Sequence, residues 1–188
     1  MFSALQTKSI SAKTSSKNSA FKTLVFEMLK ANGDFSKVNS QMRSSTIKCW
    51  VKQTYPRFLI SDGTFFIQAY FTKEAFGKCH QGKQVNINIT DLQEGLIAIS
   101  KWECELVTTN SAEEFTSFGG IEMRLIVHDF KVKLGEHVNM SKYPANLYRD
   151  DDIKAYMLHY IEKQRLGKLV PVVQNDTDIF TGAKAKGT

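Results

Sequence analysis

Aromatic and basic residues are interleaved between residues 48 and 70, and together they could stack on bases and bind phosphates. The aromatic residues are Trp50, Tyr55, Phe58, Phe66 and Tyr70, and the basic ones are Lys48, Lys52 and Arg57. Proteins that bind single-stranded nucleic acid combine these two side-chain types along one groove. We favour a different interpretation, in which most of these rings fill the core or lie beneath added helices, because a domain of this size needs several aromatic residues. The same surface could also receive a peptide or a helix from a partner protein.

Motifs that carry out catalysis are absent from the sequence. It contains no GxxxxGK[ST] phosphate loop, no GxSxG, no HExxH and no dinucleotide-binding glycine pattern. Cys79 and His80 are adjacent, which is a poor spacing for both to bind one metal ion. The remaining candidates have no catalytic partner close in sequence: His128, His137, His159, Glu113–Glu114 and Asp150–Asp152. We therefore predict a protein that is not an enzyme and needs neither a metal nor a cofactor.

The net charge of +6 over 188 residues suggests a nucleic-acid partner, but most of this charge lies near the ends of the chain. Residues 1–19 carry +3 and residues 167–188 carry +1, which leaves +2 for residues 20–166. A domain that binds phosphates by charge usually gathers its lysines and arginines on one face. We expect a disordered basic tail (1–19), one domain (20–166) and a linker (167–188), and the nearly neutral domain favours a protein partner.

The three cysteines are Cys49, Cys79 and Cys104, an odd number with no CxxC spacing, which favours a reducing compartment. No apolar run approaches the length needed to cross a bilayer. The first residues also lack an apolar stretch of signal-peptide length, which argues against secretion.

Two amphipathic helices are predicted, one at each end of the domain. The first has apolar residues at helical spacing and a natural end at Gly33: Phe21, Leu24, Val25, Met28 and Leu29. The second begins at the carboxylates of Asp150–Asp152 and repeats the spacing: Ile153, Tyr156, Met157, Tyr160 and Ile161. We expect both to pack on the domain; the alternative for the first helix is that it binds a partner.

Alternating apolar residues predict five principal strands between these helices. The expected strands are 42–54, ended by Tyr55-Pro56; 58–60 and 64–71, joined by a Ser61-Asp62-Gly63 turn; a region within 84–107 that is one bent strand or two pieces; and 121–134. Thr72 would cap a short helix, "KEAF", and residues 77–83 would form a polar loop. In the last strand Ile121 and Met123 should face inward, and Glu122 and His128 outward. This order predicts an all-β fold with added helices: a five-stranded OB-fold barrel with a short helix between strands 3 and 4, an N-terminal helix and a C-terminal amphipathic helix.

The string "FLISDGTFFIQAYFTKEAF" at residues 58–76 resembles the OB domain of the telomerase-recruiting shelterin protein (ACD type). It also resembles the ciliate telomerase holoenzyme subunit that bridges the catalytic core to accessory OB-fold complexes. The likeness rests on the "SDG" turn, the alternating strand and the Thr-basic-Glu-Ala start of a helix, and "EMRLIVHDFKV" at 122–132 is similar to the family's final strand. It covers residues 42–134.

The resemblance implies a non-catalytic adaptor in the nucleus, at the telomere, that docks on telomerase reverse transcriptase and supports repeat-addition processivity. It implies a docking patch beside and after the short helix: Lys73, Glu74, Asp91, Glu94 and Leu96. The chain departs from the animal pattern here, because it lacks a dense run of glutamates. A second implied partner is a single-strand-binding OB-fold telomere protein, so that contact with telomeric single-stranded DNA is mostly indirect. The alternative is a single-strand DNA-binding protein of the replication-protein-A or telomere-capping type, with a groove lined by Trp50, Tyr55, Arg57, Phe66 and Tyr70.

Overall fold

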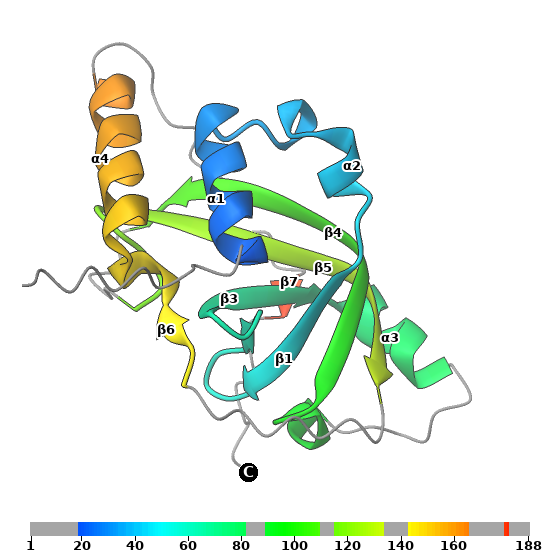
Figure 1. Cartoon of the computed structure of the whole chain (residues 1–188). Helices are drawn as coiled ribbons and strands as arrows, with labels where there is room; N and C mark the ends of the chain where they lie inside the picture. The colour runs from blue at the N-terminus through cyan, green and yellow to red at the C-terminus, as the bar shows by residue number, and fades with distance from the viewer. Residues whose placement is uncertain (1–18, 82–88, 110–114, 134–142, 166–178, 181–188) are drawn as a thin grey trace, which may run out of the picture.

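The computed structural model describes residues 19–81, 89–109, 115–133, 143–165 and 179–180 (Figure 1). The α-helices are α1 (Ala20–Lys30), α2 (Ser40–Arg43), α3 (Lys73–Gln81) and α4 (Asp151–Arg165), and the 3-10 helices are η1 (Phe35–Lys37), η2 (Ile89–Leu92) and η3 (Leu147–Arg149). The strands are β1 (Ile47–Gln53), β2 (Leu59–Ser61), β3 (Phe65–Thr72), β4 (Leu96–Thr108), β5 (Ile121–Lys133), β6 (Ala145–Asn146) and β7 (Ile179–Phe180).

Five strands close into a ring through their pairings. β1 pairs antiparallel with β2, and β2 with β3. β3 then pairs in parallel with β5, β5 pairs antiparallel with β4, and β4 returns to β1. The predicted order of three strands, a helix and two strands is confirmed, and the arrangement is OB-like.

The turn between β2 and β3 forms as the sequence predicts. Gly63 has φ +92°, a conformation that glycine adopts without steric cost. The Asp62 carboxylate accepts hydrogen bonds from the backbone N–H groups of Thr64 and Phe65, each at 2.9 Å. Thr72 caps α3 by accepting from Ala75 N at 3.2 Å. Local hydrogen bonding by Asp and Thr therefore fixes both ends of β3.

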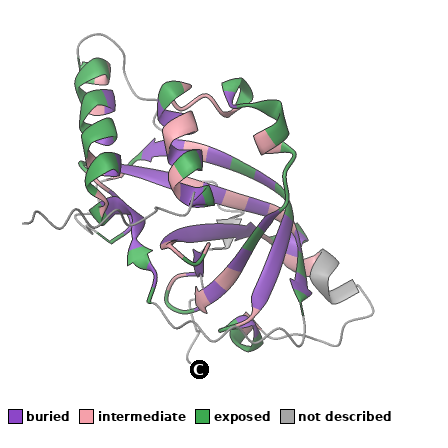
Figure 2. Cartoon of the chain, in the orientation of Figure 1, coloured by how far each residue is buried: buried purple, intermediate pink, exposed green. Residues whose placement is uncertain are grey.

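The inward side of the ring is apolar. Cys49, Val51, Ile67 and Phe71 are each at most 1% exposed. Leu125 of β5 is fully buried and is paired with Ala69 of the neighbouring strand β3, so it shares this inward side. Figure 2 shows this burial along the strands. Removing such side chains from water contributes about 1.5–3 kcal/mol each, so this core is the main source of stability for the ring.

β4 and β5 extend beyond the ring as a two-stranded arm. Their pairing continues to Thr108 and Ile121, while β1 reaches only Ile99 of β4. α1 and α4 lie beside each other at this arm (Figure 1). Buried residues on the helices include Phe21, Leu24 and Met28 of α1 and Ile153, Met157 and Tyr160 of α4. Both predicted helices are confirmed, and α1 packs on the domain.

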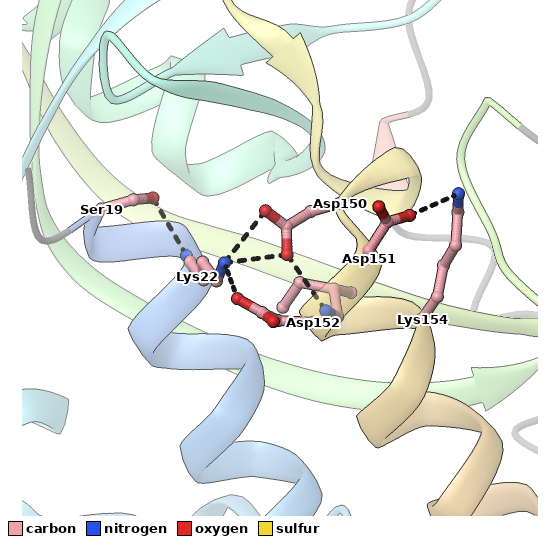
Figure 3. A network of polar contacts seen from close by, with 7 residues as sticks. Ser19, Lys22, Asp150, Asp151, Asp152 and Lys154 are labelled. Atoms are coloured by element: carbon pink, nitrogen blue, oxygen red, sulfur yellow. Dashed lines mark hydrogen bonds and ion pairs between the residues drawn. The ribbon is translucent and has the colours of Figure 1, made fainter. Parts of the chain in front are cut away.

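A polar network joins the turn to the first residues of both helices. Ser19, the N-cap of α1, donates to the Asp62 carboxylate at 2.5 Å. Lys22 Nζ lies 2.8 Å from Asp150 Oδ1 and 2.7 Å from Asp152 Oδ2 (Figure 3). Burial lowers the pKa of Lys22, but its hydrogen bonds to the two carboxylates outweigh this effect and raise the pKa overall. The network sets the position of α1 and α4 relative to the hairpin.

Four details of the sequence prediction were wrong. The first strand begins at Ile47, not at 42, because Asn39 caps the short helix α2 by accepting from Gln41 N. Residues 77–81 continue α3 instead of forming a loop. Ile89 belongs to η2, which buries Leu92, so the strand in this region starts at Leu96; residues 82–88 lie outside the described part. Two residues of the expected linker form β7, which pairs with Phe71 and Thr72 of β3.

Candidate nucleic-acid interface

One outward row of residues crosses the first three strands. Trp50 on β1 is paired with Ser61 on β2, and Ser61 with Phe66 on β3. Residues opposite one another in an antiparallel pair point to the same face, so these three side chains lie on the outside of the ring. The Trp50 ring lies against the turn: a Cβ at Gly63 would be 3.2 Å from Trp50 Cζ3.

A cation and two aromatic rings meet at one end of this row. Lys52 Nζ lies 4.0 Å from the centroid of the Phe66 ring, a cation–π distance. The Phe115 ring is tilted at 5.1 Å from Phe66. Phe66 is only 5% exposed, whereas Phe115 is 44% exposed. Phe115 therefore offers the accessible ring of this pair.

Two loops meet beside these rings. Tyr55, in the loop between β1 and β2, is 59% exposed and forms a cis peptide bond with Pro56. From the same loop, Arg57 Nη1 donates to Thr116 Oγ1 at 3.4 Å, and Thr116 precedes β5. We call Lys52, Tyr55, Arg57, Phe66 and Phe115 the aromatic site. These two loops correspond to those that flank the oligonucleotide-binding face of OB-folds.

Tyr70 is not available to a ligand. It is 5% exposed, and its hydroxyl donates to the Glu122 carboxylate. The Arg124 guanidinium lies 5.2 Å from the centroid of the Tyr70 ring, and Arg124 Nε lies 3.5 Å from Glu122 Oε2. Burial and the neighbouring Glu122 charge raise the pKa of Tyr70 well above its usual range. We call Tyr70, Glu122 and Arg124 the tyrosine–glutamate cluster.

The predicted outward orientation of Glu122 is confirmed, but Glu122 is only 5% exposed. It lies on the outward side of β5, where Tyr70 and Arg124 cover it. His128 on the same side is half-buried, and its Nε2 lies 2.7 Å from Glu103 Oε1.

The patch expected beside the short helix is split between exposed and buried residues. Lys73 and Glu74 lie exposed at the start of α3, and Asp91 and Glu94 lie exposed in and after η2. Leu96 is only 6% exposed, in β4 opposite Trp50. Leu96 is thus part of the sheet and not an apolar anchor at the surface; whether the four charged residues bind a partner stays a prediction.

Phe115 and Thr116 were missed because they lie in the connection between the predicted strand region within 84–107 and the predicted strand 121–134. The available signal was two phenylalanines, Phe115 and Phe118, in an otherwise polar segment. Only the fold places this loop against Phe66, since β5 must return beside β3.

Within the described residues, no group of three or more histidine, cysteine or acidic residues could hold a metal ion. Cys49 and Cys104 are buried in the core, and burial raises the pKa of both thiols. Among the described helices, none has the length and apolar character to cross a membrane.

Residues 30–171, which include the ring, both loops of the aromatic site and α4, match the telomere-binding protein beta subunit (TEBP beta) family. The chain belongs to the telomere-binding protein beta subunit family. It is 45% identical over 171 residues to the telomere-binding protein subunit beta of Sterkiella nova, covering 90% of this chain and 44% of that protein. It is 48% identical over 142 residues to the same subunit of Stylonychia mytilus, covering 76% of this chain and 36% of that protein.

The chain thus spans less than half the length of these curated TEBP beta relatives. A solved structure of the Est3 telomerase subunit in the yeast Hansenula polymorpha matches with a TM-score of 0.47 and 15% identity, over 61% of this chain and 75% of that one. This likeness is too weak to say what the chain binds. The resemblance drawn from the sequence was correct at the level of telomere OB-fold proteins, but the matching family is TEBP beta and not the ACD type.

Proposed function

We propose that this chain is a non-catalytic telomere subunit in the nucleus that contacts telomeric single-stranded DNA through the aromatic site. The observation that supports the proposal most is the grouping of Lys52, Phe66 and Phe115, flanked by exposed Tyr55 and by Arg57. Base stacking on aromatic side chains contributes about 1–3 kcal/mol per base, and lysine or arginine nearby can bind the phosphates. Family membership supplies the telomeric context.

The test is a titration of the protein with a G-rich single strand, comparing Tyr55→Ala/Phe115→Ala with the parent. Both rings are exposed, so their loss should leave the fold intact and weaken binding by about tenfold or more. Leu158→Ala is the matched control, because Leu158 is 50% exposed on α4. Equal affinity of the double variant and the control would reject the aromatic site as the DNA contact.

A second function is docking on telomerase reverse transcriptase, with support of repeat-addition processivity and with other OB-fold telomere proteins as further partners. It is favoured by the exposed charges at one end of the ring, namely Lys73, Glu74, Asp91 and Glu94. Charges at the rim of an interface set partner choice and the rate of encounter. Leu96 is left out of this surface because it is buried.

Replacing Asp91 and Glu94 by lysine tests this second function. The variant should fold normally but co-purify less with telomerase, and repeat addition should become less processive. If co-purification and processivity both stay at the parent level, the docking surface lies elsewhere. If the protein alone binds single-stranded DNA with sub-micromolar and steeply salt-dependent affinity, direct DNA binding is favoured over a function as an adaptor alone.

A further inference from the structure

Three lysines gather on the outward face of the sheet at the end nearest α3. Lys48 on β1 is paired with Ala98 on β4, and Ala98 with Lys131 on β5. In the next outward row, Trp50 is paired with Leu96, and Leu96 with Lys133. Paired residues share a face, so Lys48, Trp50, Lys131 and Lys133 form one surface, which we call the lysine face.

The spacing of a sheet brings these positions close together. Neighbouring strands lie about 4.8 Å apart and alternate residues about 6.6 Å apart, so the backbone positions of the three lysines lie within roughly 12 Å of one another. All three lysines are exposed, while Leu96 and Ala98 between them are buried at 6% and 8% exposure. The aliphatic stems of lysine can cover such apolar residues and leave the ammonium groups in water.

The lysines of the lysine face are unpaired within the described part of the chain. None of its three ammonium groups forms an ion pair there, and none contacts an aromatic ring there. The nearest acid along β5 is Asp129, whose carboxylate accepts a hydrogen bond from Ser100 at 2.8 Å. The Trp50 side chain between the lysines is partly exposed, although its Nε1 atom is buried and has no hydrogen-bond partner in the described part of the chain. Unpaired cations around an aromatic ring form a surface suited to a polyanion.

This face is continuous with the aromatic site. The pairings give one outward row across all five strands of the ring: Phe66, Ser61, Trp50, Leu96 and Lys133. Trp50 therefore lies between Phe66 and the lysines. Five strands at about 4.8 Å spacing make a path on the order of 20 Å along the outside of the sheet.

We propose that the lysine face binds the phosphates of a single strand where it leaves the aromatic site, and so lengthens the bound segment. The inference rests on the proposed function for the identity of the ligand. Phosphate contacts by lysine do not depend on base sequence, so this part of the site accepts any single-stranded DNA. The aromatic site would hold bases, and the lysine face would hold backbone.

The experiment compares two single strands with the full chain. One is a G-rich strand of about six nucleotides, near the lower end of OB-fold site sizes, and the other carries about twelve additional thymidines, placed in turn at each end. The parent should bind one of the extended strands about tenfold more tightly at low salt. The Lys48→Gln/Lys131→Gln/Lys133→Gln variant should lose this gain and keep its affinity for the short strand. Because each phosphate contact contributes about 0.7 to the salt slope, the slope for the extended strand should fall by about 2.

The control variant removes the same charge elsewhere, by Lys30→Gln/Lys37→Gln/Lys163→Gln, all at exposed positions on the helical side. It should keep the gain from the extension. If the lysine-face variant also keeps the gain, or if both variants lose it equally, the lysine face is not a phosphate site. If the short strand fails to bind the parent, the aromatic site is rejected, while thymidine binding that depends on Lys48, Lys131 and Lys133 would still support the lysine face.

Discussion

The lysine face and the tyrosine–glutamate cluster both include residues on the outward side of β5, but their charges have different surroundings. In the cluster, Glu122 is 5% exposed and accepts from Tyr70, with Arg124 beside both. On the lysine face, Lys131 and Lys133 are exposed and form no ion pair within the described residues. A buried and partnered charge is part of the structure, whereas an exposed cation without an acid nearby remains available to a ligand.

This difference separates residues that stabilise the domain from residues that bind. It also changes the meaning of the overall charge. From the sequence, the nearly neutral domain favours a protein partner over nucleic acid, because most of the excess charge lies near the ends of the chain. A domain with a nearly neutral net charge can still have one positive face, because its charges are separated along the sheet. Glu103, Glu105 and Glu122 lie at the end of β4 and β5 opposite to Lys131 and Lys133.

The largest expected effect is from Glu122→Ala. It leaves the buried Tyr70 hydroxyl without its acceptor and removes one carboxylate from beside Arg124, so we expect unfolding free energy to fall by about 2–4 kcal/mol. Urea unfolding measures this loss. Lys131→Ala is the matched change on the lysine face, and its effect on stability should stay within about 0.5 kcal/mol. Similar losses for both variants would contradict the comparison.

A smaller loss of stability is expected from Gly63→Val in the turn beside Trp50. The residue has φ +92°, and a Cβ would lie 3.2 Å from the Trp50 ring, so the substitution should cost about 2 kcal/mol. Thermal melting measures the loss. Gly77→Ala is the control, because Gly77 lies in α3 and a Cβ there meets nothing within 4 Å. That change should be neutral or stabilise by up to about 1 kcal/mol; a melting curve for Gly63→Val equal to the parent's would show that the turn tolerates a side chain.

Much of the fold could be predicted from local patterns. The helical spacing of Phe21 to Leu29, the Ser61-Asp62-Gly63 turn and the alternation in β5 each act over short distances, and each formed as expected. The errors occurred where local capping competed with alternation. Asn39 caps the short helix α2 (Ser40–Arg43), so the strand expected from residue 42 starts only at Ile47. The helix that Thr72 caps continues past Gly77, where a loop was expected.

The candidate site was harder to predict because it depends on register between distant strands. Tyr70 and Tyr55 have the same residue type, yet one is buried against Glu122 and the other is 59% exposed. Phe115 reaches Phe66 only after β5 has returned beside β3. Neither Lys131 nor Lys133 was predicted as a site residue, because only their pairing with Ala98 and Leu96 places them next to Trp50.

The cluster should also make stability depend on alkaline pH. The pKa of Tyr70 is raised in the folded protein by burial first and then by Glu122, against about 10 in the unfolded chain. The folded state therefore holds this proton more tightly, so the contribution is fully present below pH 10 and is lost as pH rises towards the folded pKa. Each such group lowers the unfolding free energy by about 1.4 kcal/mol per pH unit in this range.

Tyr70→Phe isolates this contribution. At pH 7 the unfolding free energy of the variant should be about 1 kcal/mol lower, because the hydrogen bond to Glu122 is lost. Above pH 10 the fall of its unfolding free energy with pH should be smaller than the parent's by about 1.4 kcal/mol per pH unit. Tyr148, Cys49 and Cys104 also have raised pKa values from burial, so the variant should keep part of the alkaline loss. Urea unfolding at a series of pH values from 7 to 11 measures both slopes. Parallel curves for parent and variant above pH 10 would mean that the cluster does not raise the pKa of Tyr70. Glu122 would then not stabilise the domain through Tyr70.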